Sequence, residues 1–316
     1  MLYGWCPGRT GLQWTESLRD LMTFLTIRHV TTYRYRRPVA FGEHRLMFRP
    51  RDSDRQKVRA VHLAITPLPA DLDFIDDEFG NQIAVVRFSA SAEQLRFECV
   101  VHVERPPQSG PGFDRARAGM FPVTYDETTR RELTSSIGRR HADPDDLVGA
   151  WASGFLPNDS AIGNFELLVA MTEGIRLGMR YQRREEKGIQ GPGETLRRRQ
   201  GSCRDFALLL VEAARSLGFA ARFASGYLGA SMDDPAGGAT HAWAQVYLPI
   251  AGWVDFDPTS GTAGAANLVT VAVVADPSQA LPLHGTYFGA AGDHLGMDVH
   301  VRVIDRVDDP VTEGNR

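Results

Sequence analysis

Cys203 is the cysteine of this sequence whose neighbours could support chemistry. A glycine and a serine precede it, and a helical apolar pattern continues from Phe206 to Leu217. This pattern predicts a helix that begins near residue 202, with the cysteine in its first turn. The free amides and the dipole of a helix start favour an anion. They therefore favour the thiolate, which is the nucleophilic form of cysteine.

A thiolate nucleophile needs a base, and the base needs a group that orients it. His241 opens one predicted strand, and Asp255 and Asp257 close the next one. If Gly252 lies in the turn between them, the strands are antiparallel and the histidine lies beside a carboxylate. Residues two apart on a strand face the same side, so alternation does not choose between the two aspartates.

The other two cysteines, Cys6 and Cys99, have different surroundings. Cys99 lies on the apolar face of an alternating segment, and we expect it to be a core residue. Three cysteines this far apart cannot all pair, so no disulfide framework is expected. This cysteine usage is typical of a reducing compartment, and we expect the protein in the cytoplasm.

The N-terminal part of the chain shows apolar and polar residues in alternation, which is typical of strands with one buried face. Turn-forming residues separate these segments, and no helical period occurs before residue 105. The sequence therefore predicts an all-β sandwich in this region. The alternating segments cover residues 25–35, 61–65, 83–88 and 95–103.

The pattern changes after a breaker-rich stretch at 105–112, which is expected to be a linker. Apolar residues then recur every three or four positions before alternation returns. Helices followed by an antiparallel sheet indicate an α+β fold. The expected elements are helices at 165–181 and 202–217, a loop at 188–193, strands at 219–227, 241–248 and 253–257, and an alternating run at 297–303.

Composition excludes several classes of function for this chain of 316 residues. A formal net charge of -4, with only short basic runs, argues against a nucleic-acid partner. No apolar run reaches the ~18 residues of a membrane helix, and residues 1–21 lack the pattern of a secretory signal. The segment 191–195 lacks the ending of a phosphate loop, and His284, His294 and His300 lack the spacing of a zinc site. We therefore expect no metal and no cofactor.

Five sequence blocks between residues 201 and 259 resemble the transglutaminase-like superfamily in content and order. The N-terminal strands from His29 to Asn81 resemble the β domain that precedes this core in bacterial members, and the tail from Asp276 to Val303 also resembles theirs. The five blocks are Gly201-Ser-Cys-Arg-Asp-Phe-Ala207, Leu217-Gly-Phe-Ala-Ala-Arg222, Ser225-Gly-Tyr227, His241-Ala-Trp-Ala-Gln-Val-Tyr247 and Gly252-Trp-Val-Asp-Phe-Asp-Pro-Thr259.

The resemblance implies a papain-like core with the triad Cys203, His241 and Asp257. It selects Asp257 over Asp255 because, in the family, the aspartate directly before Pro-Thr completes the triad. It implies a protein or peptide amide as the substrate and a thioester intermediate. A thiol-dependent amide hydrolase or peptidase is the favoured reading. A protein-glutamine acyltransferase is the alternative, and a non-catalytic binding module on a relic core is the alternative of another class.

Stabilisation of the tetrahedral oxyanion in such a reaction requires hydrogen-bond donors. The backbone amide of Cys203 is the first candidate, and a side chain of Gln200, Gln182 or Tyr181 is the second. Trp243 is expected to cover the triad and exclude water, or to be a core residue.

The expected organisation has four parts, and the first of them does not share the regular pattern of the rest. Residues 1–22 are expected to be a lead-in that is disordered or not native. The remaining parts are a β-sandwich domain at 23–106, the catalytic core at 107–270, and a C-terminal β segment and tail at 271–316.

Overall fold

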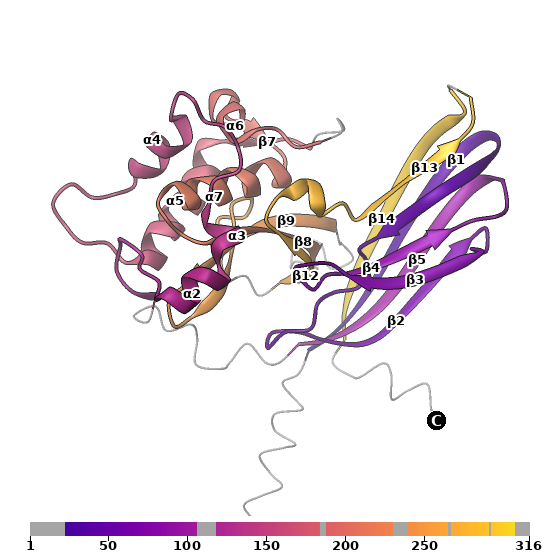
Figure 1. The fold of residues 1–316 in the computed structure, drawn as a ribbon, viewed down its shortest axis with the longest axis horizontal. Helices are drawn as coiled ribbons and strands as arrows, with labels where there is room; N and C mark the ends of the chain where they lie inside the picture. Colours follow the sequence, from indigo (N-terminus) through magenta and orange to yellow (C-terminus); the bar gives the residue numbers. More distant parts are fainter. Residues whose placement is uncertain are drawn as a thin grey trace, which may run out of the picture.

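The computed structural model describes residues 23–105, 118–183, 188–229, 239–264, 267–290 and 292–306. It shows a strand-rich β domain beside a core in which helices cover a sheet (Figure 1). The expected α+β fold with an N-terminal all-β domain is confirmed. The expected lead-in, and the expected linker apart from residue 105, lie outside the described residues.

One long strand, β1 (Thr23–Leu46), organises the β domain. Its first half pairs with β5 (Ala92–Arg105) and β14 (His294–Arg306). Its second half pairs with β4 (Gln82–Arg87) and β13 (Leu283–Phe288). The outer strands β2 (Lys57–Thr66) and β3 (Asp71–Asp76) pair with β5 and β4, respectively. The two halves of β1 thus pair with different strands of one connected sheet, and apolar residues of both halves share one core cluster.

The alternation in the sequence predicted the buried face of the central strand β5 correctly. Each residue of its apolar series is at most 1% exposed. The edge strand β2 is less covered, since Val61 remains 37% exposed. An edge strand has a neighbour on one side only, which explains the weaker burial. The buried series in β5 comprises Leu95, Phe97, Cys99, Val101 and Val103.

The core contains a sheet in the order β11-β10-β9-β8-β12. Its main helix, α7 (Cys203–Ser216), contacts β8 and β9. The strands of the sheet are β8 (Ala221–Leu228), β9 (Ala239–Leu248), β10 (Gly252–Asp257), β11 (Thr262–Ala263) and β12 (Leu268–Val274). The other helices are α2 (Glu127–Glu132), α3 (Thr134–Ile137), α4 (Leu147–Ser153), α5 (Asn164–Gly178) and α6 (Pro192–Arg198).

The predicted helices and strands of the core agree with this structure to within a few residues, but the short helices were not foreseen. Residues 192 and 193, expected in a loop, begin α6, where Pro192 occupies the first turn. Proline is well suited to that position because its missing N–H would have no intrahelical partner there. Turn-forming residues at a helix start can therefore imitate a loop.

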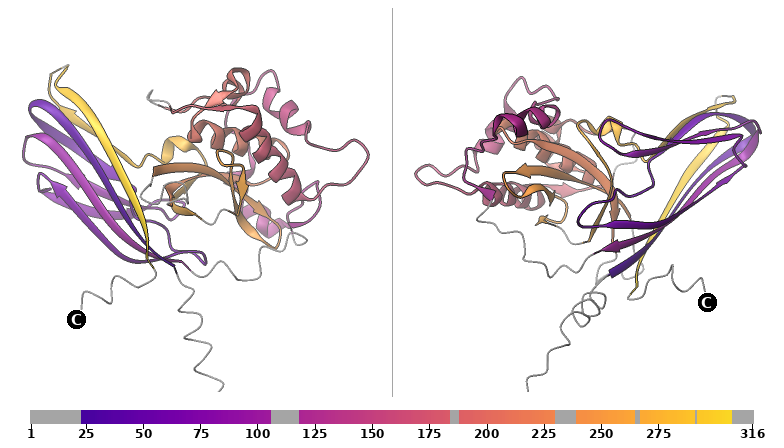
Figure 2. Two further views of the ribbon diagram at one scale, coloured as in Figure 1. Left: turned by 180° about the vertical axis from the view of Figure 1, so that it is seen from behind. Right: turned by 60° about the horizontal axis from the view of Figure 1, so that its bottom comes forward.

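The C-terminal segment divides between the two units. The boundary expected at residue 270 falls within β12, which belongs to the core sheet. After the short 3-10 helix η2 (Pro277–Gln279), β13 and β14 return to β1. Views from behind and below show this return and place the core sheet between the helices and the β domain (Figure 2).

A single apolar cluster joins the β domain to the core sheet. It combines Ile27 and Val101 from the β domain with Phe223 and Val271 from the core. Buried polar contacts cross the same boundary, because Asn81 exchanges hydrogen bonds with the backbone of Val273 at 2.8 and 2.9 Å. The two units are therefore packed together through an interior, not tethered side by side.

Candidate active site

Cys203 occupies the first position of α7, as its flanking residues predicted. Ser202 is the N-cap, and its backbone N–H and hydroxyl both donate to Asp205 Oδ2 at 2.8 Å. The N–H of Gln190 donates to the other oxygen of that carboxylate at 2.7 Å. Because Asp205 is fully buried, this capping box fixes the backbone that carries the sulfur.

His241 and Asp257 lie on adjacent antiparallel strands, β9 and β10. Phe256 is opposite Ala244, so Asp257 continues the register opposite Trp243 and reaches His241 diagonally. The distance from His241 Nε2 to Asp257 Oδ2 is 3.0 Å. The two side chains are only 7% and 2% exposed, which removes competing water from the pair.

Two further donors hold the Asp257 carboxylate. The hydroxyl of Ser260 donates to Oδ2 at 2.7 Å, and the N–H of Thr259 donates to Oδ1 at 2.9 Å. Burial by itself would raise the pKa of Asp257, but the hydrogen bonds from His241, Ser260 and Thr259 outweigh burial and lower it. The carboxylate therefore stays charged beside the imidazole.

The imidazole of His241 lies between this carboxylate and Cys203. Burial alone would lower its pKa, but hydrogen bonds to Asp257 and Cys203 and their negative charges raise it to about 10. Since Nε2 faces Asp257, Nδ1 is the ring nitrogen left for the sulfur. The raised pKa favours an imidazolium that faces the sulfur of Cys203.

Asp255 has a different set of partners. Its Oδ1 accepts hydrogen bonds from Trp243 Nε1 at 2.7 Å and from Gln245 Nε2 at 2.8 Å. Alternation correctly placed Asp255 and Asp257 on one face but could not choose between them. The strand register makes the choice, since each aspartate bonds to a different part of β9.

The expected oxyanion donors lie on the short parallel pair β6 (Arg180–Tyr181) and β7 (Gln200–Gly201), or directly after it. Gln182 is exposed, and its backbone N–H donates to the carbonyl of Gly201. The side-chain oxygen of Gln200 accepts a hydrogen bond from Arg180 at 2.5 Å. In the described part of the chain, neither of these side chains bonds to Cys203, His241 or Asp257.

Tyr181 is the candidate donor for which an electrostatic interaction with Cys203 is found. It pairs with Gly201 in the strand register, and its ring contacts Phe206 of α7 at 6.4 Å between centroids. Burial and the nearby Cys203 both raise the pKa of the Tyr181 phenol, so the phenol remains a proton donor. Tyr181 is 52% exposed and therefore open to a bound molecule.

Trp243 is fully buried beside the triad. Its ring is nearly parallel to that of His241, with 6.2 Å between centroids and 24° between planes. Its indole N–H is donated to Asp255, so this group is not free to bind an oxyanion. The structure therefore assigns Trp243 to the packing beneath the imidazole.

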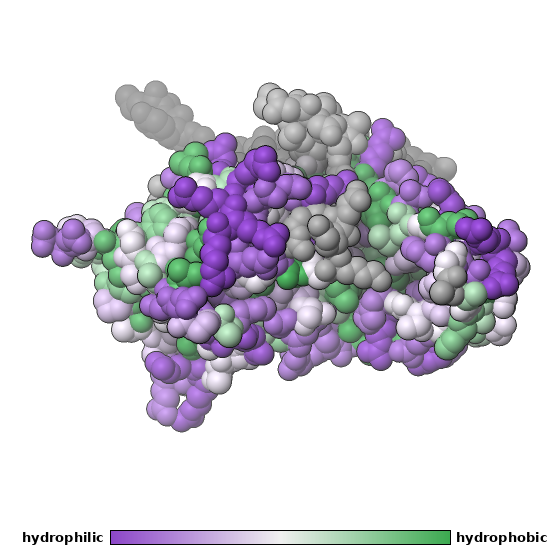
Figure 3. Space-filling view, turned by 90° about the horizontal axis from the view of Figure 1, so that it is seen from above, coloured by the Kyte–Doolittle hydropathy of each residue, from purple (hydrophilic) through white to green (hydrophobic). Residues whose placement is uncertain are grey.

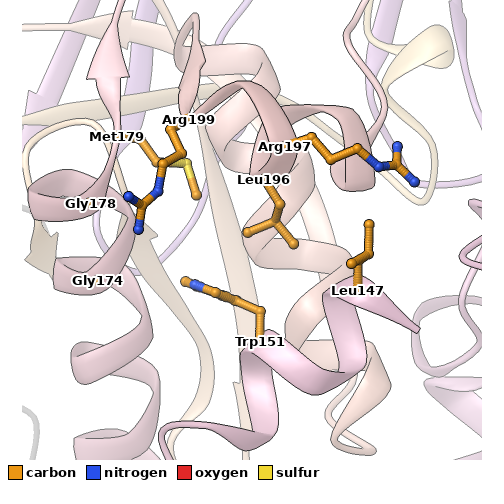
Figure 4. A pocket seen from close by; sticks show the side chains of 8 residues that line it. All are labelled: Leu147, Trp151, Gly174, Gly178, Met179, Leu196, Arg197 and Arg199. Atoms are coloured by element: carbon orange, nitrogen blue, oxygen red, sulfur yellow. The ribbon is translucent and has the colours of Figure 1, made fainter. Parts of the chain in front are cut away.

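An open pocket of about 340 Å³ lies in the helical part of the core, among α4, α5 and α6 (Figure 4). None of the triad residues lines it. Over the face seen from above, hydrophobic and hydrophilic residues are interspersed (Figure 3). The residues that line the pocket are Leu147, Trp151, Gly174, Gly178, Met179, Leu196, Arg197 and Arg199.

No group of three or more His, Cys, Asp or Glu side chains in the described part of the chain could hold a metal ion. Nor does that part contain a helix of sufficient length and apolar character to cross a membrane.

Comparison with protein families extends the likeness beyond the triad blocks. Residues 157–258 match the transglutaminase-like superfamily, and residues 25–104 match the bacterial transglutaminase-like N-terminal region. The superfamily match covers the part of the chain that holds Cys203, His241 and Asp257. The two matches correspond to both parts of the bacterial arrangement that the motifs indicated.

Relatives of known sequence and structure match different lengths of the chain. An uncharacterized protein of Mycobacterium tuberculosis is 29% identical over 296 residues, covering 88% of this chain and 91% of its own. One from Mycobacterium leprae is 33% identical over 119 residues, 36% of this chain and 42% of that protein. The crystal structure of a proposed cysteine protease from Cytophaga hutchinsonii superposes with a TM-score of 0.69 at 18% identity. It covers 90% of this chain and 92% of its own, which shows the shared fold.

Sequence reasoning did not find Ser260 or the partners of Asp255. The turn after Asp257 carries a signal for Ser260, because aspartate and serine near a Pro-Thr turn commonly bond within it. Arg55, which also bonds to Asp255, has no such local signal, because it lies 200 positions away in the chain.

Proposed function

We propose that this protein is a thiol-dependent amide hydrolase in which Cys203, His241 and Asp257 form the catalytic triad. The observation that supports it most directly is the buried His241–Asp257 hydrogen bond at 3.0 Å, with the second ring nitrogen left for the sulfur. A carboxylate in this position fixes the orientation of the imidazole and stabilises its cation. The proposed substrate is a protein or peptide amide.

The reaction proceeds in two acyl-transfer steps. The Cys203 thiolate attacks the amide carbonyl carbon, the C–N bond breaks, and the His241 imidazolium gives its proton to the leaving amine. A thioester remains on the sulfur. Neutral His241 then takes a proton from water, the resulting hydroxide attacks the thioester, and the C–S bond breaks to regenerate the thiolate. The product is a carboxylic acid.

Two donors are proposed for the oxyanion of the tetrahedral intermediate. The N–H of Cys203 lies in the first turn of α7, where no intrahelical acceptor exists. The Tyr181 hydroxyl can provide the second hydrogen bond from β6. Loss of one such donor costs about 2.7–4 kcal/mol of transition-state stabilisation in enzymes where it has been removed.

Wild-type protein and Cys203→Ala should be compared on glutaminyl, peptidyl and peptidoglycan-derived amides, each with and without an added amine. We expect turnover in the wild type, its loss in Cys203→Ala, and unchanged folding. Cys99→Ala is the matched control, because Cys99 is a buried core thiol and its loss should preserve turnover. Full activity in Cys203→Ala would contradict the assignment.

The same panel separates the rival functions. Amide products that incorporate the added amine would identify a protein-glutamine acyltransferase, whereas acid products identify a hydrolase. A binding module would give no turnover, and its Cys203 would react slowly with iodoacetamide. A triad thiolate should instead alkylate rapidly at pH 6–7, below the ionisation of an ordinary thiol at about 8.5.

A further inference from the structure

Arg55 of the β domain reaches the strand that carries Asp257. It lies just before β2, and its guanidinium is 3.3 Å from Asp255 Oδ2. The Asp255 side chain is 10% exposed, whereas that of Arg55 is 51% exposed. The ion pair therefore joins a half-exposed arginine of the β domain to a nearly buried carboxylate of the core.

The segment around Arg55 is fixed to the core by its neighbours. The Gln56 side chain donates to the carbonyl of Thr270 at 2.8 Å and accepts from the N–H of Thr270 at 3.0 Å. The N–H of Arg51 also donates to this carbonyl at 2.9 Å. Gln56 is only 3% exposed, so these bonds are shielded from water. The backbone that presents Arg55 is thus attached to β12.

On the core side, Asp255 is the common acceptor for two side chains of β9. Trp243 and Gln245 donate to its Oδ1, and the Gln245 oxygen accepts from Arg222 Nε at 2.9 Å. Arg222 in turn lies 3.8 Å from the centre of the Trp253 ring. A shift of the Asp255 carboxylate would therefore be passed to Trp243, and through its ring to His241.

We propose that Arg55 is a positioning residue of the active site, which fixes Asp255 from the β domain and so keeps Trp243 packed beneath His241. The consequence for catalysis rests on the triad function proposed above. This link gives the β domain a role in the chemistry of the core. Supporting contacts of this kind matter because a catalytic group must be held close to its productive geometry.

Removal of Arg55 has different consequences for the stability of the protein and for the position of the Asp255 carboxylate. An ion pair with one half-exposed partner contributes little to the free energy of unfolding. When Arg55 is removed, Arg222 remains a nearby cation, linked through Gln245, but the Asp255 carboxylate keeps only neutral donors in direct contact, at Oδ1. It can then move toward solvent to recover hydration, because a poorly compensated buried charge is unfavourable. Removal of Arg55 should therefore change the position of the Asp255 carboxylate more than it changes the free energy of unfolding.

The test measures iodoacetamide alkylation of Cys203 at pH 6.5, followed by mass spectrometry of its peptide, in the full chain. This reaction reports the sulfur–imidazole pair without any substrate. We expect Arg55→Leu to slow alkylation by about tenfold, the lower end of what losing an outer hydrogen-bond partner costs at metal sites. Arg55→Lys should restore most of the rate, because it keeps the cation.

Arg87→Leu is the matched control. Arg87 is 47% exposed and pairs with carboxylates of its own domain, so its removal should leave the alkylation rate unchanged. Thermal unfolding of each variant is recorded in parallel. If Arg55→Leu fails to fold, Arg55→Gln, which retains a polar donor without the charge, replaces it with the same expected slowing.

The outcomes separate the two proposals. Slow alkylation of the wild type itself would overturn the proposed function. Rapid wild-type alkylation that is unchanged in folded Arg55→Leu or Arg55→Gln would overturn the positioning role alone. Equal slowing in Arg87→Leu would also overturn it, because a general effect of the β domain would then be responsible.

Discussion

His241 has two opposed influences on its charge, and the structure shows which is stronger. Burial disfavours the imidazolium, while the Asp257 carboxylate and the sulfur favour it, and the net effect raises its pKa to about 10. The residue is therefore cationic throughout neutral pH. In the proposed reaction, proton donation by His241 to the leaving amine is available over that range and is lost as the pH rises through about 10.

Asp257→Asn tests this balance directly. The Asp257 carboxylate is the main group that raises the pKa of His241 against the effect of burial. Without it, the titration midpoint of His241 should move down from about 10 toward or below its ordinary value of 6.5. Nuclear magnetic resonance of the labelled imidazole against pH measures the midpoint. Turnover should fall by on the order of 10³-fold or more, because the amide of the new asparagine favours the wrong tautomer of the His241 imidazole. An unchanged midpoint would show that Asp257 does not set the charge.

The residues of the candidate site differ in how far the sequence alone could predict them. Cys203 and His241 stand in local contexts, a helix start and a strand start, that the pattern of residues reveals. The choice of Asp257 required the family resemblance, since Asp255 shares its face. Arg55 could not be found, because its contact with Asp255 depends on how two units pack and not on any local pattern.

At the scale of elements, α7 is the part that presents Cys203, the proposed nucleophile. Its start is held by Asp205, a buried carboxylate that accepts from the N–H and hydroxyl of Ser202 and from the N–H of Gln190. The capping box therefore connects the helix to the loop before α6. The sequence predicted a helix that begins near residue 202, but it did not indicate that Asp205 also accepts a hydrogen bond from residue 190.

Asp205→Ala should destabilise the protein by about 3 kcal/mol, because it leaves several buried donors without an acceptor. Urea unfolding measures the loss, and alkylation of Cys203 should slow as the helix start loosens. Asp126→Ala provides the comparison, since Asp126 caps α2 through Thr129 but is exposed. Its effect should be clearly smaller. Equal losses in both variants would mean that burial of the cap is unimportant.

The hairpin of β9 and β10 illustrates why secondary structure alone was insufficient. Strand positions, the antiparallel direction and the shared face of the aspartates all followed from alternation and one glycine. The register did not, because it depends on the turn between Leu248 and Gly252, where Ile250 adopts a φ of +69°. A shift of the register would exchange which residues of β9 the two aspartates reach.

At the scale of the whole molecule, the domains do not follow one another along the chain as simply as the sequence predicted. The β domain and the core were both visible in the sequence as changes of periodicity. The return of β13 and β14 to β1 was not, because pairing partners that are more than 200 residues apart leave no local signal. The resulting architecture places both ends of the described chain in the β domain.

This closure makes the β domain part of the structural support of the core. His29 of β1 bonds to the hydroxyl of Tyr227 in β8 at 2.9 Å, and burial lowers the pKa of His29 to about 4, so it is neutral in the boundary. Together with the shared apolar cluster, such contacts would be exposed if one unit unfolded alone. Partial unfolding should therefore be unfavourable.

We consequently expect the two units to unfold in one transition. Labelling of Cys99, which is 1% exposed in β5, reports the β domain, and fluorescence of Trp151, Trp243 and Trp253 reports the core. The two probes should give the same guanidinium midpoint, since coincidence of independent probes is the test of two-state behaviour. The measurement uses a chain in which the other cysteines and tryptophans are replaced, by Cys6→Ser, Trp5→Phe, Trp14→Phe and Cys203→Ala. Cys99 labelling at a clearly lower denaturant concentration than the fluorescence change would show that the β domain opens while the core persists.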